Sequence, residues 1–209
     1  MKKILTLLLS GFMLFSITGC GNSNAAAPNP SSQQTASVSN EKSTSVASNT
    51  TVANKSGKKV LIAYFSHTGN TQKVANQIHE FVGGDIVEIK TEAAYPTNYS
   101  ECTDLAKREK ESNARPKLST KIENMGSYDA IFVGYPIWWY TAPMAINTFL
   151  ESYDLTGKTI IPFCTSGGSD VAESIPAIKR LCPNSTILPG LTANNLSDIK
   201  PWLSKLGML

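Results

Sequence analysis

The sequence predicts an α/β fold in which helices cover both faces of a parallel sheet. Three apolar runs, at residues 59–65, 130–135 and 159–164, are continuous, as expected for strands that are buried on both faces. Each run is followed by apolar residues at helical spacing, and strands that alternate with helices form parallel sheets. The block at residues 58–209 is large enough to bury a core of its own.

The first strand precedes a predicted helix at residues 71–82, where apolar residues recur at helical spacing. Gly83 and Gly84 end this helix, because glycine readily adopts the backbone conformation that follows a helix. Residues 85–90 alternate between polar and apolar side chains and predict the second strand.

Two further strand and helix pairs follow the central crossover. The strand at residues 130–135 leads to a predicted helix at residues 142–152, and the strand at residues 159–164 leads to one at residues 171–181. A short fifth strand is predicted at residues 186–188. The closing helix is predicted at residues 196–206.

The segment between the second and third strands, residues 91–127, is longer than a simple crossover. Charges of both signs alternate at residues 100–112, which predicts a solvated helix face with local ion pairs. Tyr95 and Tyr99 precede this helix, and we treat a contact of these rings with a bound ligand as a hypothesis.

Residues 1–20 form a predicted targeting segment. Lys2 and Lys3 precede an apolar run at residues 4–17, which is shorter than the roughly 20 residues of a spanning helix. The Ile-Thr-Gly that precedes Cys20 resembles the lipoprotein box of bacterial signal peptides, in which the cysteine is lipidated. This resemblance implies an extracytoplasmic protein anchored to a bacterial membrane through acyl chains on Cys20. An ordinary secretory signal is the alternative.

Composition separates a tether from the folded block. Residues 21–57 consist mainly of Ser, Thr, Asn, Ala, Gln and Pro, which predicts a flexible tether. The net charge of +3 lies in residues 1–57, because residues 58–209 carry 15 basic and 15 acidic side chains. No Lys and Arg cluster with interleaved aromatics occurs in the folded block, so we expect no nucleic-acid partner.

The loop after the first strand, residues 66–71, predicts an anion site. In open parallel sheets, ligands bind beyond the carboxyl ends of the strands. Gly69 allows a tight turn, and three hydroxyl groups lie at the start of a helix whose free N–H groups favour an anion. The loop has no Lys or Arg, so neutral donors would bind a phosphate. A simple helix cap by Ser and Thr is the alternative.

The loops after the third and fourth predicted strands suit a flat ligand. Residues 136–143 include two Trp and one Tyr, which would form an aromatic wall beside the phosphate-binding loop. Residues 165–170 include Gly167 and Gly168, which allow close backbone approach to a ring. Ordinary core aromatics and a plain turn from strand to helix are the respective alternatives.

Taken together, the three loops resemble those of flavodoxins and flavodoxin-like FMN proteins over residues 58–209. The resemblance implies a three-layer, doubly wound fold with a five-stranded parallel sheet in the order 2-1-3-4-5, and a non-covalent FMN. It implies phosphate contacts from the first loop, ring contacts from the second and contacts with the pyrimidine edge from the third. The implied cofactor-binding residues are Ser66, His67, Thr68, Gly69, Asn70, Thr71, Pro136, Ile137, Trp138, Trp139, Tyr140, Thr165, Ser166, Gly167, Gly168 and Asp170.

The resemblance implies electron transfer between FMN and a redox partner protein or small acceptor. The alternatives are an FMN-dependent NAD(P)H:quinone-type reductase and a flavodoxin-like binding module without flavin. No pairing of nucleophile and base predicts a catalytic residue, and His67 and His79 lack the flanking ligands of a metal site. Cys102, Cys164 and Cys182 have no CxxC spacing, and we expect them to be buried as small apolar side chains. Oxidation of one pair in an exported protein is the alternative.

Overall fold

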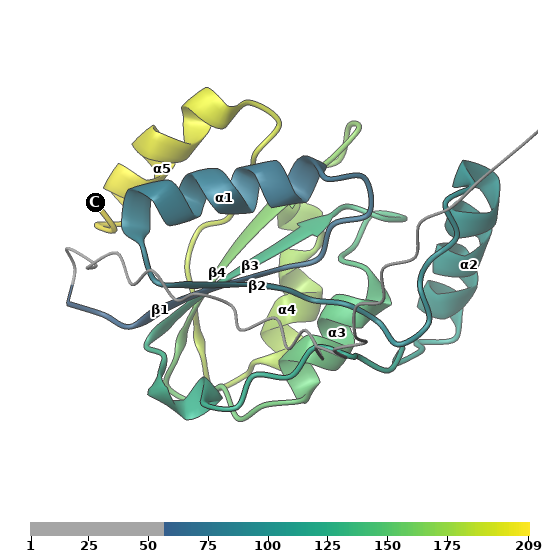
Figure 1. Ribbon diagram of the computed structural model, residues 1–209, viewed down its shortest axis with the longest axis horizontal. Coiled ribbons are helices and arrows are strands. Elements are labelled where there is room, and N and C mark those ends of the chain that lie inside the picture. The colour runs from purple at the N-terminus through teal and green to yellow at the C-terminus, as the bar shows by residue number, and fades with distance from the viewer. Residues whose placement is uncertain (1–56) are drawn as a thin grey trace, which may run out of the picture. The chain divides into compact units, whose positions relative to one another are not determined.

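The computed structural model describes residues 57–209, which form one layered α/β unit (Figure 1). The predictions for the signal segment, Cys20 and the tether up to residue 56 lie outside the described residues. No helix in the described part of the chain is long and apolar enough to cross a bilayer.

The sheet is parallel throughout and confirms the predicted strand order, β2-β1-β3-β4-β5. Four strands form its body: β1 (Val60–Tyr64), β2 (Asp85–Glu88), β3 (Ala130–Pro136) and β4 (Thr159–Thr165). Almost every residue of β1 and β3 is buried, as their continuous apolar runs predict. The carboxyl ends of these strands therefore meet at one edge.

The fifth position of the sheet differs from the prediction, because two short strands share it. Strands β5 (Thr186–Ile187) and β6 (Leu191–Thr192) both pair with β4, whereas we expected a single strand at residues 186–188. Between them lie Pro189 and Gly190, and proline has no N–H group to donate to a ladder.

The facing strand explains the same interruption. Ile160 and Cys164 accept hydrogen bonds from the N–H groups of Leu188 and Ala193, at 3.0 and 2.7 Å. Pro162 lies midway between Ile160 and Cys164, so its missing N–H group faces this edge too. A Cβ atom at Gly190 would lie only 3.0 Å from the carbonyl oxygen of Pro162, so the chain passes close to β4 here.

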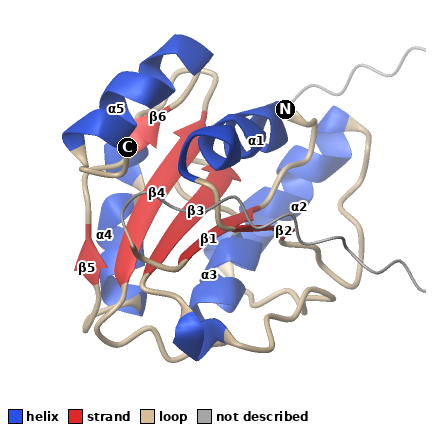
Figure 2. Cartoon of the chain, turned by 60° about the vertical axis from the view of Figure 1, so that its left-hand side comes forward, coloured by secondary structure: helices blue, strands red, loops and turns tan. Residues whose placement is uncertain are grey.

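Helices cover both faces of the sheet, which confirms the three-layer arrangement (Figure 2). An apolar core lies on each face of the sheet, and alternate residues of β1 pack into the two cores. Ile62 packs on the side of α1 and α5, and Leu61 packs on the side of α3 and α4. The covering helices are α1 (Asn70–Val82), α3 (Met144–Glu151), α4 (Ile175–Leu181) and α5 (Ile199–Lys205).

Two predicted helices begin later than expected. A 3-10 turn at Val171–Glu173 precedes α4, and a second one at Leu196–Asp198 precedes α5. Pro176 and Pro201 lie in the first turns of α4 and α5. Proline fits the first turn of a helix but cannot continue a helix that is already formed, so each helix restarts at its proline.

Helix α2 (Tyr99–Glu111) stands to one side of the three layers (Figure 1). Most of its residues are exposed, and Lys107 and Glu111 form a loose ion pair at 3.9 Å, as the charge pattern predicts. Only Cys102 and Ala106 of this helix are buried.

The three cysteines of the described region are buried and unpaired, which confirms their predicted role as small apolar side chains. Burial raises the pKa of the Cys164 thiol to about 11, with a smaller opposing effect of its hydrogen bond to Thr192. Burial also raises the pKa of Cys182 to about 11. Both side chains therefore stay in the uncharged thiol form at neutral pH.

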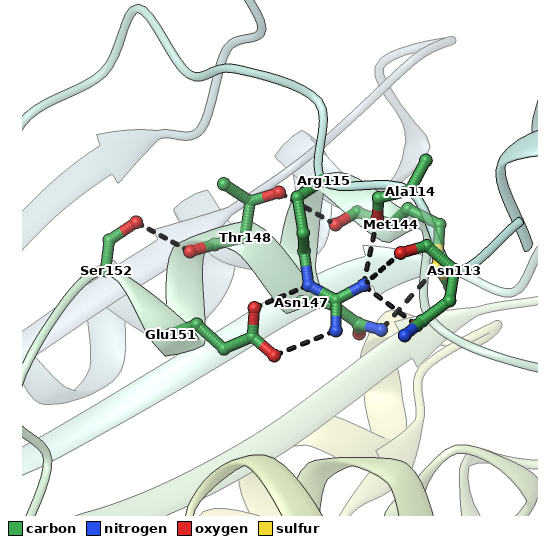
Figure 3. Close-up of polar contacts among 8 residues, drawn as sticks. All are labelled: Asn113, Ala114, Arg115, Met144, Asn147, Thr148, Glu151 and Ser152. Carbon is green, nitrogen blue, oxygen red and sulfur yellow. Dashed lines mark hydrogen bonds and ion pairs between the residues drawn. The ribbon is translucent and has the colours of Figure 1, made fainter.

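Arg115, in the segment that follows α2, joins this segment to α3 (Figure 3). Its guanidinium group donates hydrogen bonds to both carboxylate oxygens of Glu151 and to the carbonyl oxygens of Asn113 and Ala114. The hydrogen bond from Arg115 lowers the pKa of the Glu151 carboxyl group. This fork joins the far end of α2 to the helix that follows β3.

Candidate functional site

The three loops predicted to bind a ligand meet at the carboxyl edge of the sheet. Ile137 donates its N–H group to the carbonyl oxygen of Thr165 at 2.9 Å, and the hydroxyl oxygens of Thr71 and Thr165 lie 2.9 Å apart. A hollow of about 500 Å³ opens among the loops. Its lining residues are Thr68, Asn70, Lys73, Val74, Pro136, Ile137, Thr165, Ser166, Gly167, Ala193, Asn194 and Leu196.

The first loop, residues 66–71, is called the hydroxyl loop from here on. Ser66 Oγ accepts hydrogen bonds from the N–H groups of Gly69 and Gln72, at 3.1 and 3.3 Å. Gly69 has a φ angle of +83°, which side chains with a Cβ atom rarely adopt. Ser66 therefore shapes the loop from inside rather than lining the hollow.

The start of α1 leaves donors for a ligand. The N–H groups of Asn70 and Thr71 make no hydrogen bond within the described part of the chain. Thr68 and Asn70 line the hollow, whereas Thr71 is buried against Thr165. Free N–H groups at the positive end of a helix dipole favour an anion, so this turn fits a phosphate group.

Residues 165–170, called the glycine loop, are held by a side chain that the sequence pattern did not indicate. Asn194 accepts a hydrogen bond from the Ser166 N–H group at 3.0 Å and donates one to the Ser166 carbonyl oxygen at 2.8 Å. Ser166 Oγ in turn accepts from the N–H groups of Gly168 and Ser169. Asn194 follows the unpredicted strand β6, so only the pairing of that strand brings it to the site.

Asp170 has a different environment from the one we expected. Its carboxylate accepts hydrogen bonds from the Ala172 N–H group at 2.8 Å and from the Thr192 hydroxyl group at 3.1 Å. The first of these bonds caps the 3-10 turn that follows the loop, and the second joins Asp170 to β6. Asp170 and Gly168 do not line the hollow.

The aromatic turn, residues 138–141, is a tight two-residue turn. The N–H groups of Trp138 and Thr141 each donate to the other's carbonyl oxygen, at 2.9 and 3.1 Å. The two central residues, Trp139 and Tyr140, have φ angles of 49° and 65°. Turns of this kind usually contain Asn and Gly, because each non-glycine residue at positive φ costs on the order of 1 kcal/mol.

Helix α2 holds the aromatic turn from outside the sheet. The indole N–H group of Trp139 donates to the carbonyl oxygen of Thr103 at 2.9 Å, and the Lys110 ammonium group donates to the carbonyl oxygen of Trp139 at 2.7 Å. The Lys107 ammonium group lies 5.3 Å from the centre of the Trp139 ring. The exposed helix thus has a structural role that its charge pattern did not indicate.

Trp138 lies in a cluster of aromatic rings behind the turn. Its ring centre is 5.4 Å from that of Phe65, 5.0 Å from that of Tyr95 and 5.8 Å from that of His67, all in edge-on geometry. Tyr95 thus contacts Trp138, one of the predicted site residues, whereas Tyr99 is 83% exposed.

The Tyr95 hydroxyl group donates to a carboxylate oxygen of Glu109 at 2.7 Å. Burial raises the pKa of both groups. The hydrogen bond raises the pKa of Tyr95 further and partly offsets the rise for Glu109. This pair connects the ring cluster to α2.

The structure therefore divides the predicted site residues into two groups. Those that line the hollow are Thr68, Asn70, Pro136, Ile137, Thr165, Ser166 and Gly167. Those outside its lining are Ser66, His67, Gly69, Thr71, Trp138, Trp139, Tyr140, Gly168 and Asp170.

Lys73 also lines the hollow and was not predicted, although its position three residues after Asn70 places it on the same helix face. Among the residues that the structure describes, no three His, Cys, Asp or Glu side chains form a possible metal site.

Comparison with known proteins supports the assignment of the fold. The flavodoxin family model matches residues 59–206. A flavodoxin of Haemophilus influenzae is 28% identical over 114 residues, which make up 53% of this chain and 51% of that protein. The chain thus spans about half the length of the curated relatives it matches.

Among solved structures, a protein described as a flavoprotein from Bacteroides eggerthii is 37% identical, with a TM-score of 0.67. The match covers 73% of this chain and 99% of that one. A flavoprotein of Lactobacillus acidophilus, solved in complex with FMN, has a TM-score of 0.60 at 23% identity, covers 69% of this chain and 98% of that one, and supports the fold alone. The sheet order and the family match agree, and the chain belongs to the flavodoxin family.

Proposed function

We propose that the protein binds FMN in the hollow at the carboxyl edge and acts in electron transfer. The observation that carries this proposal is the convergence of three loops on one hollow of about 500 Å³, beside the start of a long helix. Ligand sites in proteins usually measure about 300 to 1,000 Å³. Membership of the flavodoxin family supports FMN as the cofactor.

The residues of the hollow fit the parts of FMN. Thr68, Asn70 and the free N–H groups of the first turn of α1 would hold the phosphate group. Pro136 and Ile137 offer an apolar surface to the ring system. A Cβ atom at Gly167 would meet no atom within 4 Å, so its backbone is open to the polar edge of a ring.

The chain itself supplies position and environment rather than redox chemistry. FMN, when bound, supplies one-electron and two-electron transfer. The loops orient it, because Asn194 and Ser66 hold the glycine loop and the hydroxyl loop in fixed shapes before any ligand binds. Trp138 and Trp139 remain proposed ring contacts, since they are the next two residues after the lining residue Ile137.

The visible spectrum of residues 58–209, before and after addition of FMN, tests the cofactor. This fragment contains the whole described sheet and both helix layers. We expect flavin absorption bands that stay with the protein on gel filtration, and quenching of flavin fluorescence on binding. A protein that remains colourless at saturating FMN would overturn the proposal and favour a binding module without flavin.

The type of electron transfer needs a second assay. A carrier exchanges electrons with a protein or small acceptor and turns over NADPH and a quinone slowly, whereas a reductase consumes both steadily. We expect the loaded protein to behave as a carrier. Steady NADPH consumption that depends on the quinone would instead establish the reductase alternative.

We further propose that the protein is anchored outside the cytoplasm through acyl chains on Cys20. The lipobox-like sequence before Cys20 supports this anchor, and about 0.8 kcal/mol per buried methylene would hold a multiply acylated chain on a membrane. We expect the full chain to sediment with membranes and the Cys20→Ala variant to lose its acyl label. Equal labelling of both chains would refute the assignment of Cys20.

A further inference from the structure

We infer that Lys73 binds the phosphate group of the ligand and makes the site prefer a phosphorylated flavin over an unphosphorylated one. The inference rests on the proposed function, since it concerns the same hollow. It changes the expectation from the sequence, in which only neutral donors hold the phosphate.

The position of Lys73 supports this role. It lies in the first turns of α1 and lines the hollow together with Thr68 and Asn70. Helix side chains point back towards the N-terminus, so the four-carbon stem of Lys73 extends over the turn that carries the free N–H groups. Its ammonium group can therefore reach an anion that those N–H groups bind.

Charge supports the same conclusion. Lys73 is the only formally charged residue among those that line the hollow. Its ammonium group has no ion pair or hydrogen bond within the described residues, unlike Lys107 and Lys110, which both contact the aromatic turn. A phosphate monoester carries nearly two negative charges at neutral pH and would be the natural partner of an unpaired ammonium group.

The consequence is a difference between two flavins that share the same ring. FMN and riboflavin differ only in the phosphate group, so a residue that binds the phosphate affects FMN alone. Residues that shape the hollow would affect both flavins.

The experiment measures the Kd of FMN and of riboflavin by fluorescence quenching, with the full chain and its variants. Lys73→Met keeps the apolar stem and removes the charge, and Lys73→Arg restores a cation. Lys179→Met is the matched control, because Lys179 is an exposed lysine on α4, on the opposite face of the sheet.

We expect Lys73→Met to weaken FMN binding by about five- to tenfold and to change riboflavin binding by less than about twofold. Lys73→Arg and Lys179→Met should bind both flavins as the parent chain does. Salt from about 0.05 to 0.5 M should weaken FMN binding in the parent chain more than in Lys73→Met. Equal losses for both flavins, or no loss for FMN, would overturn the inference.

Inorganic phosphate separates this inference from the proposed function. We expect phosphate to raise the thermal unfolding temperature of the parent chain, and to raise that of Lys73→Met less. If the parent chain binds no flavin but shows this difference, the proposed function fails and the anion-binding role of Lys73 stands. If it binds FMN and Lys73→Met binds FMN equally well, the inference on Lys73 fails alone.

Discussion

The hydroxyl loop and the aromatic turn lie at the same edge of the sheet but are held in different ways. The hydroxyl loop is shaped mainly by local hydrogen bonds, because Ser66 Oγ accepts from N–H groups three and six positions away, and Thr71 adds one distant contact with Thr165. The aromatic turn is held by α2, through Lys110 and Thr103, which lie 29 and 36 positions from Trp139. The shape of the hydroxyl loop therefore follows mainly from nearby residues. The shape of the aromatic turn depends on contacts with α2 that form only in the folded chain.

Strain separates the two loops as well. The hydroxyl loop uses a glycine at its one positive φ angle, so its conformation costs little. The aromatic turn places Trp139 and Tyr140 at positive φ, which only contacts from outside can stabilise. Substitutions in and around the two loops test this contrast.

Trp138→Ala should remove the contact between the aromatic turn and the ring cluster behind it. Truncation of a buried aromatic residue costs about 3 to 5 kcal/mol, and Trp138 is half-buried, so we expect a loss of about 2 to 3 kcal/mol in the free energy of unfolding. Urea unfolding measures this loss. Tyr99→Ala, at an 83% exposed position, is the control and should change stability by less than about 0.5 kcal/mol. Equal effects of the two variants would show that the ring cluster does not anchor the turn.

Ser66→Ala should weaken the local hydrogen bonds of the hydroxyl loop. Because Ser66 Oγ accepts hydrogen bonds from two backbone N–H groups, we expect its loss to lower the free energy of unfolding by about 1 kcal/mol, measured by urea unfolding. Hydrogen exchange at Gly69 and Gln72 should become faster. Thr68→Ala is the control, since the Thr68 hydroxyl group makes no hydrogen bond within the described residues. If exchange at Gly69 stays unchanged, the loop is held by contacts other than Ser66.

Tyr140→Gly should stabilise the protein although it removes a large side chain. Relief of the positive φ angle favours glycine by about 0.5 to 1 kcal/mol, and the exposed Lys110 contact with the Tyr140 ring, at 6.0 Å, is weak. Thermal unfolding should show a higher midpoint for Tyr140→Gly and a lower one for Tyr140→Val, because a β-branched residue fits this angle poorly. A lower midpoint for Tyr140→Gly would mean that the ring contact outweighs the strain.

Helix α2 should also give stability a small pH dependence through Glu109, which accepts a hydrogen bond from Tyr95. Its pKa is raised in the folded protein, mainly by burial, so the folded state keeps a proton that the unfolded state releases. Stability from this group is fully present below its ordinary pKa and falls as the pH rises through the raised value. We expect a change below about 1 kcal/mol, since solvent screens this partly exposed group.

Urea unfolding between about pH 4 and pH 7 measures this slope. Glu109→Gln should remove it while still accepting a hydrogen bond from Tyr95. Glu92→Gln, at an exposed position, should leave the slope unchanged. A slope that persists in Glu109→Gln would assign the pH dependence to another group.

The sequence predicts those parts of the site whose contacts join residues close together in the chain. Thr68, Asn70 and Gly69 belong to one short motif whose hydrogen bonds are local, and the structure places this motif at the start of α1 as expected. Asn194 follows β6, which Pro189 and Gly190 separate from β5. No local sequence pattern therefore predicted that Asn194 would bind Ser166. No local pattern predicted that α2 would hold the aromatic turn either, because the charge pattern of α2 is typical of any exposed helix.

The sequence alone predicted the alternation of buried strands and helices, and with it the parallel sheet and the edge at which we propose that the ligand binds, because burial on both faces leaves a continuous apolar pattern. It also determined the hydroxyl loop, whose shape depends on neighbours within a few residues. The folded structure was needed to show that Lys73 and Asn194 line the hollow and that α2 contacts Trp139. Asn194 and α2 lie far along the chain from the residues that they contact, so no local pattern specifies those contacts. The spacing of Lys73 from Asn70 marks a shared helix face, but it does not show that this face meets the hollow.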